Sequence, residues 1–323
     1  MNARVILYGV GAIGLETARA AAQRRDILLV GAIDTDPEKA GRDLGDLTGV
    51  DSLRGIAVSD QPAQVPAGTG PLVALLTTSS RLEQVFPQLE QLARAGVNVV
   101  SSCEELSFPW YHHPDWADRI HRLAQSHNVR ILGTGVNPGF VLDELVVTMA
   151  SVCSRVTRIE ARRILDAGKR REPLQKKVGA GMAEAEFRDL VGRNALGHLG
   201  LAESVAYVAE GMGWKLDSIS ESTDPVISDR DVQTPYVKVS KGEVAGLRMI
   251  AVGKKGDAAV ITLELQMYVG ARRPVDEIYI EGEPSLRTRI PRGIPGDIAT
   301  VAKLINSIPR VLQGEPGLLR PRS

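Results

Sequence analysis

The sequence predicts an α/β fold class in which a doubly wound parallel sheet is joined to a second, α+β domain. Over roughly the first 135 residues, short apolar runs alternate with stretches of helical spacing, which is typical of parallel strands covered by helices. After about residue 140, runs that alternate apolar and charged residues are separated by hairpin-like turns, which favours antiparallel strands. We therefore expect domains at residues 1–140 and 141–290, and a C-terminal segment, 291–323, that returns to the first domain.

The first strand and helix carry a G-x-G-x-x-G motif. It follows the apolar run 5–8 and leads into a helix expected over 13–24, and the next apolar run, 27–33, ends in an acid. In a Rossmann unit these glycines permit a tight turn, the approach of a pyrophosphate and close helix packing, and the acid accepts the hydroxyls of an adenosine ribose. The helix N-terminus favours the phosphates. The motif predicts a nicotinamide dinucleotide site at Gly9, Gly11, Ala12, Ile13, Gly14 and Asp34.

The acid also bears on the choice between the two dinucleotides. A carboxylate at Asp34 should repel a 2′-phosphate, so the sequence favours NAD. Arg42 lies close enough in the sequence to leave NADP open.

Composition and cysteine usage limit the remaining classes of protein. The chain has 39 Lys and Arg against 39 Asp and Glu, so no net field favours nucleic acid or an anionic membrane. No apolar run reaches the length of a membrane span, and no signal-peptide pattern opens the chain. Cys103 and Cys153 have no metal-ligand spacing, and the His112–His113 pair has no third ligand, so we expect no metal site. Because only two cysteines are present, we also expect reduced thiols and a cytoplasmic location.

Ligands of a doubly wound sheet bind at the carboxyl ends of its strands. Further strands are expected at 72–77, 98–101 and 129–132, which directs attention to the loops 77–80, 101–105 and 133–139. Thr77, Thr78 and Ser79 can contact the cofactor through hydroxyl and N–H groups, or simply cap the helix expected over 82–95. Asn137 lies in a turn-rich segment that either brings it to the nicotinamide or only connects the domains.

The loop 101–105 contains two adjacent acids, Glu104 and Glu105. A carboxylate there can bind a substrate ammonium, take its proton, or hold the water that attacks an iminium. Two neighbouring acids cannot both point into one pocket from an extended backbone, so we expect one of them to be structural. The alternative is that both are solvated acids in the first turn of a helix.

The second half is expected to contain strands, helices and one basic loop. The strands are placed at 156–164, 236–239, 246–252 and 261–269, and the helices at 183–193, 199–211 and 298–308, the last bounded by Pro309. His198, near a helix start, is interpreted as structural or pocket-lining. The basic stretch 169–177 is interpreted as a solvated loop rather than an anion site.

Several motifs together resemble one known family. They are GVGAIG at 9–14, AIDTDPEKAGRDLG at 32–45, SSCEEL at 101–106, GVNPGFVLD at 135–143, PLQKKVGAGM at 173–182, GHLGLAESV at 197–205, GIPGDIAT at 293–300 and IPRVLQGEPGL at 308–318. The chain resembles the NAD(P)-dependent amine dehydrogenases related to 2,4-diaminopentanoate dehydrogenase, which are distant relatives of dihydrodipicolinate reductase. The reductase's own signature, a His-His pair followed by Lys and a Ser-Gly-Thr stretch, is absent.

The resemblance implies a Rossmann domain, a substrate and dimerisation domain, and a homodimer. It places the catalytic acid at Glu104, with Glu105 second, and the cofactor against Cys103 and Asn137. It further implies a substrate pocket lined by Ile164 and Asp166 with His198 near it.

The implied reaction is reversible oxidative deamination of a primary amine, or reductive amination of a ketone or aldehyde with ammonia. A specific 2,4-diaminopentanoate dehydrogenase would need a cation for the substrate carboxylate, for which Arg162, Lys169, Arg170 and Lys176 are candidates. The run Ile164–Ala167 offers no cation, which favours simple amines. Two alternatives stay open: a non-catalytic NAD-binding sensor, and an alcohol or sugar dehydrogenase that works without ammonia.

Overall fold

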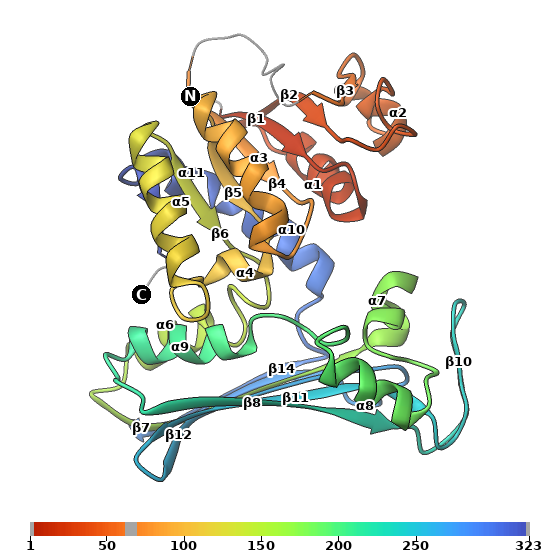
Figure 1. Cartoon of the computed structure of the whole chain (residues 1–323), viewed down its shortest axis with the longest axis vertical. Helices are drawn as coiled ribbons and strands as arrows, with labels where there is room; N and C mark the ends of the chain where they lie inside the picture. Colours follow the sequence, from red (N-terminus) through yellow and green to blue (C-terminus); the bar gives the residue numbers. More distant parts are fainter. Residues whose placement is uncertain (1–2, 62–69, 321–323) are drawn as a thin grey trace. The chain divides into compact units, whose positions relative to one another are not determined.

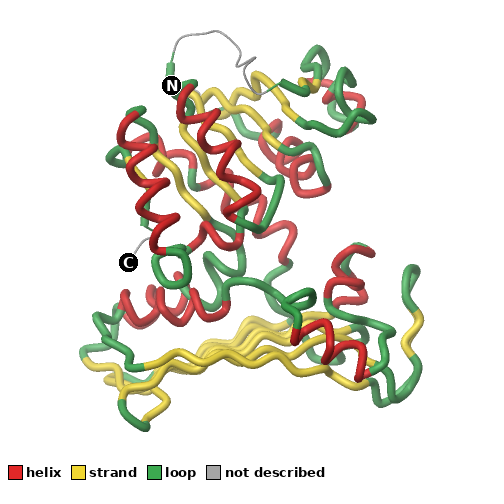
Figure 2. Tube along the Cα trace, viewed as in Figure 1, coloured by secondary structure: helices red, strands yellow, loops and turns green. Residues whose placement is uncertain are grey.

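The computed structural model describes residues 3–61 and 70–320, which form two compact units. The first unit contains the residues up to Gly139 and those from Pro295 onward, and the second runs from Phe140 to Ile294. Figure 1 labels their helices and strands, and Figure 2 shows the same trace by type of secondary structure.

The first unit is built on a seven-stranded sheet in which every pair of neighbouring strands is parallel. Its strands, in sheet order, are β15 (Gly317–Leu318), β6 (Arg130–Gly133), β5 (Asn98–Ser101), β4 (Leu72–Leu76), β1 (Ala3–Tyr8), β2 (Ile27–Ile33) and β3 (Val58–Ser59). All five residues of β4 are buried, as expected for a parallel strand covered on both faces. The direction of winding reverses between β1 and β4, which is where ligands of such sheets bind.

Helices cover both faces of this sheet (Figure 1). α3 (Leu82–Arg94) and α5 (Pro114–Ser126) pack on one face. α1 (Ala12–Ala22), α10 (Gly296–Asn306) and α11 (Ile308–Gln313) pack on the other. The short elements α2 (Leu44–Thr48), η1 (Asp51–Leu53) and α4 (Glu104–Ser107) lie in the connections. The doubly wound parallel sheet predicted from the sequence is confirmed.

The end of the chain differs in one detail from the sequence prediction. Pro309 was expected to bound a final helix over 298–308. Instead α10 ends at Asn306, and Pro309 lies in the first turn of a further helix, α11. A proline is tolerated there because the first N–H groups of a helix have no partner within the helix.

The second unit contains a six-stranded mixed sheet. Its strands, in sheet order, are β14 (Leu286–Pro291), β13 (Val275–Glu283), β7 (Arg155–Asp166), β12 (Ala258–Tyr268), β11 (Val244–Lys255) and β8 (Ser218–Ile227). β11 and β12 form the predicted antiparallel hairpin, whereas β12 pairs with β7 in parallel. The separate strands β9 (Val232–Gln233) and β10 (Lys238–Val239) pair only with each other among the described residues. Residues 240–242, where the sequence favours a hairpin turn between the expected strands 236–239 and 246–252, therefore join strands that do not pair. Strands β8, β13 and β14 had not been predicted.

One face of this sheet is covered by a helix, and the other carries more exposed side chains, of which many are charged. α9 (Leu201–Gly211) packs on β8, β11 and β12, and the remaining helices are α6 (Glu144–Ala150), η2 (Ala167–Lys169), α7 (Glu172–Lys177) and α8 (Glu184–Gly192). Along β7 the buried Ile159, Ala161 and Arg163 alternate with the more exposed Glu160 and Arg162, as the period of a strand requires. None of the helices within residues 3–61 and 70–320 has both the length and the apolar character needed to cross a membrane.

Candidate active site

The glycine motif forms a turn in which two glycines are required by packing and one is not. Gly9 has φ +100°, and a Cβ there would lie 3.0 Å from Thr77 Oγ1. A Cβ on Gly14 would overlap the carbonyl oxygen of Gly9, so the close approach of α1 to β1 needs a glycine. A Cβ on Gly11 would meet nothing within 4 Å. The position at Gly11 is therefore open, which leaves room for the pyrophosphate that the motif predicts there.

The start of α1 faces the same space. Ala12 and Ile13, both predicted as cofactor contacts, are the first two residues of this helix. The preceding residue, Gly11, provides no side-chain cap for their N–H groups. A helix N-terminus of this kind attracts an anion through its N–H groups and the helix dipole.

Asp34, at the end of β2, is held against the glycine loop. Its Oδ2 accepts hydrogen bonds from the backbone N–H of Val10 at 2.7 Å and from Lys39 Nζ at 3.3 Å. Its Oδ1 accepts one from the N–H of Asp36 at 2.9 Å. The carboxylate is thereby fixed at the position where a dinucleotide ribose binds in Rossmann units. Lys39 was not among the predicted site residues.

The loop after β4 connects the glycine motif to α3. Thr77 donates from Oγ1 to the carbonyl of Gly9 at 2.9 Å. The hydroxyls of Thr78 and Ser79 donate to the side chains of Gln88 and Gln84, both in α3. The structure therefore brings Thr77 to the glycine turn, while Thr78 and Ser79 have their hydroxyls engaged with the next helix.

The loop after β5 buries its cysteine. Cys103 is fully buried, and its N–H donates to Ser101 Oγ at 3.1 Å. Burial raises the pKa of the Cys103 thiol to about 12, so the group stays protonated at neutral pH. The thiol is therefore an uncharged packing group rather than a nucleophile.

The two adjacent acids begin α4 and have different surroundings. Glu105 is 8% exposed, and its Oε2 accepts from the N–H of Leu82 at 2.7 Å, at the start of α3. Its own N–H donates to the carbonyl of Ser80 at 3.1 Å. Glu104 is half-buried with Oε2 in the interior, and successive helical residues point about 100° apart. Glu105 thus caps α3. Glu104, which also follows the carboxyl end of β5, points in a different direction from Glu105.

The loop after β6 closes on the same strand ends. The N–H of Thr134 donates to the carbonyl of Ser101 at 2.8 Å. A Cβ on Gly133 would overlap the carbonyl of Leu106, so this glycine lets α4 approach β6. Asn137, which precedes Pro138 through a cis peptide bond, has its Oδ1 buried. The ends of β1, β4, β5 and β6 are therefore joined by direct contacts, and the predicted residues of the first unit lie at this edge.

The predicted pocket residues Ile164, Asp166 and His198 all belong to the second unit. Ile164 and Asp166 are in β7, and His198 is a half-buried residue shortly before α9. Asp166 Oδ1 accepts from the N–H groups of Gly168 and Gly270, each at 3.0 Å. This carboxylate therefore fastens the turn after β7 to the turn after β12.

A buried ion pair in the second unit was not predicted from the sequence. Arg163 and Asp276 are each 1% exposed, with Arg163 Nη1 3.2 Å from Asp276 Oδ2. Arg163 Nη2 donates to the carbonyl of Ile294 at 2.6 Å, and Asp276 Oδ2 accepts from the N–H of Ile294 at 2.7 Å. Burial lowers the pKa of Arg163 and raises that of Asp276. Their separation in the sequence gives no signal of this contact.

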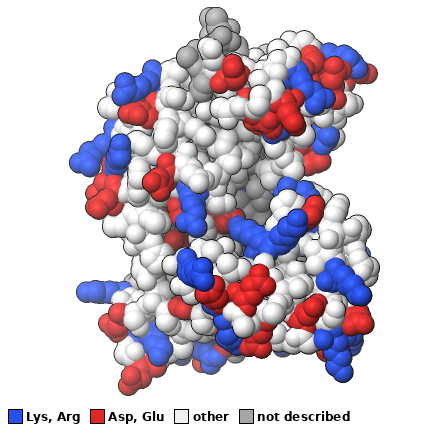
Figure 3. Space-filling model, turned by 45° about the vertical axis from the view of Figure 1, so that its right-hand side comes forward, with Lys and Arg blue, Asp and Glu red and all other residues white. Residues whose placement is uncertain are grey.

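The charged groups of the surface are mixed. On the face shown in Figure 3, acidic and basic side chains are interspersed, so neither sign dominates. Among the residues that the structure describes, no three His, Cys, Asp or Glu side chains are grouped in a way that could hold a metal ion.

Comparison with known proteins identifies the family. The family model for the 2,4-diaminopentanoate dehydrogenase C-terminal domain matches residues 140–321. The chain belongs to this family. It is 29% identical to 2,4-diaminopentanoate dehydrogenase of Acetoanaerobium sticklandii, over 98% of this chain and 91% of that protein. It is 22% identical to an amine dehydrogenase of Streptomyces virginiae, over 97% of this chain and 93% of that protein.

A solved structure agrees with this assignment. The amine dehydrogenase of Mycobacterium smegmatis matches with a TM-score of 0.86 and 27% identity, covering 99% of this chain and 97% of that one. The family, the fold class and the dehydrogenase class predicted from the sequence are confirmed.

Proposed function

We propose that this chain is an NAD(P)-dependent amine dehydrogenase that interconverts a primary amine with a ketone or aldehyde and ammonia. The observation that carries the proposal is the Glu104 carboxylate at the carboxyl end of β5, in the sheet that also holds the glycine turn, while its neighbour Glu105 caps α3. Family membership and the two similar amine dehydrogenases support oxidoreductase chemistry on CH–NH2 groups.

The residues at the start of the first unit fit a dinucleotide. The space at Gly11, the uncapped start of α1 and the fixed Asp34 carboxylate would hold its pyrophosphate and ribose. When bound, its nicotinamide supplies the hydride acceptor or donor. Because Asp34 is an acid at the ribose position, we propose NAD as the preferred form.

Glu104 provides the acid–base chemistry in this proposal. In the oxidative direction its carboxylate accepts a proton from the bound ammonium, which leaves a neutral amine able to lose hydride. The protonated Glu104 then releases this proton to solvent, and the restored carboxylate stabilises the positive charge of the iminium. It next takes a proton from the attacking water and passes that proton to the nitrogen, so that ammonia leaves and the carbonyl forms. In the reductive direction the steps run in reverse, and Glu104 returns these protons while ammonia and the carbonyl condense.

A narrower candidate is 2,4-diaminopentanoate dehydrogenase activity, which the 29% identity to that enzyme favours. Its substrate carboxylate needs a cation. Of the four candidates, Arg162 donates to Glu277 Oε2 at 2.5 Å and Lys176 lies 2.7 Å from Glu172 Oε1. The paired state of these two supports a simple amine as the first choice. Substitution of Lys169 tests the diamino acid.

The proposed assembly is a homodimer in a reducing, cytoplasmic compartment. The dimer is what the family resemblance implies, and we place its contact on the face of the six-stranded sheet where Glu160, Arg162 and Tyr279 line a hollow of about 540 Å³. Cys103 and Cys153 form no disulfide, which agrees with a reducing compartment. Light scattering after size-exclusion chromatography should give twice the chain mass, and a monomeric mass would contradict the dimer.

The proposed reaction is tested by NADH oxidation with a panel of small ketones and aldehydes, each with and without ammonium, near pH 9. Consumption that depends on ammonium is expected, and the best carbonyl gives the size of the pocket. The 2-amino-4-oxo acid related to 2,4-diaminopentanoate belongs in the panel as the narrower candidate. Consumption independent of ammonium would indicate an alcohol dehydrogenase. Tight NADH binding without turnover on any member would favour the sensor.

A further inference from the structure

Lys39, in the turn after β2, bridges two carboxylates. Its Nζ is 3.3 Å from Asp34 Oδ2 and 2.9 Å from Asp36 Oδ2. The Asp34 oxygen is the one that also accepts from the N–H of Val10. An ammonium therefore lies directly at the carboxylate that the adenosine ribose needs in a Rossmann unit.

The charges of this group do not cancel. Two carboxylates and one ammonium leave one negative charge in excess. The hydrogen bond to Asp36 is the largest cause that raises the pKa of Lys39, and the same bond lowers the pKa of Asp36. The Lys39 ammonium is therefore protonated near neutral pH. This ammonium offsets part of the repulsion that Asp34 alone would exert on a 2′-phosphate. Asp36 competes with the phosphate for the same ammonium.

The turn that carries Lys39 is closed by backbone hydrogen bonds to β3. The N–H of Asp34 donates to the carbonyl of Ser59 at 2.9 Å, and the N–H of Gly41 donates to that of Val58 at 2.8 Å. Lys39 lies between these two points. Its side chain is 29% exposed, so it reaches solvent without being fully surrounded by it.

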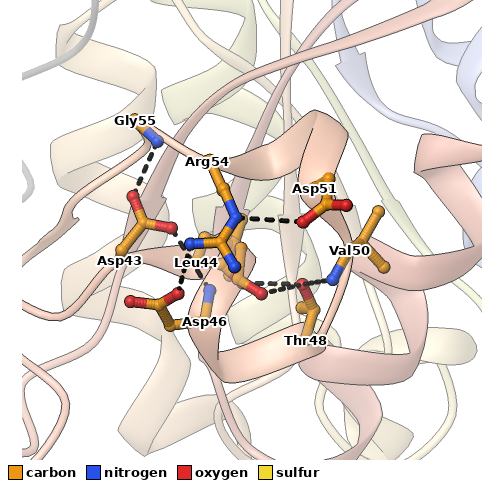
Figure 4. A network of polar contacts seen from close by, with 9 residues as sticks. Asp43, Leu44, Asp46, Thr48, Val50, Asp51, Arg54 and Gly55 are labelled. Atoms are coloured by element: carbon orange, nitrogen blue, oxygen red, sulfur yellow. Dashed lines mark hydrogen bonds and ion pairs between the residues drawn. The ribbon is translucent and has the colours of Figure 1, made fainter.

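The segment that follows is held by the network in Figure 4. Asp43 accepts from the N–H of Asp46 at 3.2 Å and from that of Gly55 at 2.7 Å. Arg54 binds Asp46 at 2.9 Å and Asp51 at 3.0 Å. These contacts hold the chain that follows the turn, while the backbone bonds of Asp34 and Gly41 hold the ends of the turn itself.

We infer that Lys39 is the residue that determines how well the site accepts a 2′-phosphate, and that Asp36 limits this by holding the ammonium. The inference rests on the proposed dinucleotide cofactor. Arg42, the cation suggested by the sequence, is exposed, and it lies outside the group formed by Lys39 with Asp34 and Asp36.

The test measures binding without turnover. Calorimetric titration with ADP-ribose and with 2′-phospho-ADP-ribose isolates the phosphate, because neither ligand has a nicotinamide. Lys39→Met should lower the affinity for 2′-phospho-ADP-ribose about tenfold more than the affinity for ADP-ribose, as expected for a partly exposed charge-assisted pair. Asp36→Asn should act in the opposite direction and raise the affinity for 2′-phospho-ADP-ribose roughly threefold or more, with less effect on the affinity for ADP-ribose. Added salt should reduce the selective part of both effects.

Arg42→Gln is the matched control, since it removes one positive charge from the same loop. It should change the two affinities by the same factor, within about twofold. If Lys39→Met weakens both ligands equally, or if Arg42→Gln carries the selective loss, the assignment to Lys39 is wrong while the dinucleotide site stands. If the unaltered protein binds neither ligand, both this inference and the proposed function are contradicted.

Discussion

At the carboxyl ends of the parallel strands, the glycine turn and the uncapped start of α1 border open space, whereas on the sheet of the second unit charged side chains pair with one another. A Cβ at Gly11 would meet nothing within 4 Å, and α1 starts there without a side-chain cap. In the second unit, Arg163 pairs with Asp276, and Arg248 donates to Glu264 at 2.5 Å.

This difference shows that the number of charged residues does not locate a site. The sheet of the second unit has many more charges than the strand ends of the first, yet most of those named above are neutralised by a neighbour. Backbone donors arranged around space can bind a ligand, whereas the paired charges on the second sheet mainly hold the fold together. The predictions below separate these two roles.

The largest loss of stability is expected from breaking the buried pair. Arg163→Met leaves the Asp276 carboxylate buried beside Ile294, and such a change typically costs about 3–5 kcal/mol. The midpoint of urea denaturation should fall accordingly. Arg155→Met is the control, because the Arg155–Glu283 pair is 67% and 62% exposed and should contribute about 0–1 kcal/mol. Equal effects of the two changes would remove the distinction between buried and exposed pairs.

The glycine turn gives a comparison within a single motif. Gly14→Ala should lower stability by about 1–3 kcal/mol, because its Cβ would overlap the carbonyl of Gly9. Gly11→Asn supplies a good helix cap and should keep the denaturation midpoint. It should nevertheless weaken NADH binding roughly tenfold or more, about 1.4 kcal/mol, by filling the space at this position. If fluorescence titration shows that Gly11→Asn binds NADH with unchanged affinity, the phosphates of the dinucleotide lie elsewhere.

A smaller effect is expected at Glu105. Glu105→Gln weakens the cap on the N–H of Leu82 and should cost about 1 kcal/mol of stability, the usual size for a helix cap. Thermal denaturation measures it. A change of several kcal/mol would indicate that Glu105 has a larger role than capping α3.

The sequence predicted the first unit more completely than the second. The glycine spacing, the helix after it and Asp34 are local signals, and they lie within one strand–helix–strand unit. β13 and β14 have the alternation typical of strands, and Gly282 and Pro284 mark the turn between them, so the local signal was present although neither strand was predicted. The place of β13 is decided by pairing with β7, far away in the sequence, and β14 pairs with β13.

The site residues show the same limit. Sequence alone indicated that one of Glu104 and Glu105 would be structural, but the choice depends on where Leu82, the first residue of α3, lies. Lys39 is near Asp34 in the sequence, yet its contact depends on how the turn folds back. The Arg163–Asp276 pair joins two strands through their register. Local patterns reveal motifs, and contacts between distant segments appear only in the folded chain.

The measurement that tests the central claim most directly is the ammonium-dependent turnover of Glu104→Gln beside its affinity for NADH. Removing a well-placed acid or base usually costs about 10²–10⁴ in rate. The account predicts a loss of that size with NADH affinity and denaturation midpoint unchanged. Full turnover of Glu104→Gln would contradict the role of Glu104 and the mechanism built on it.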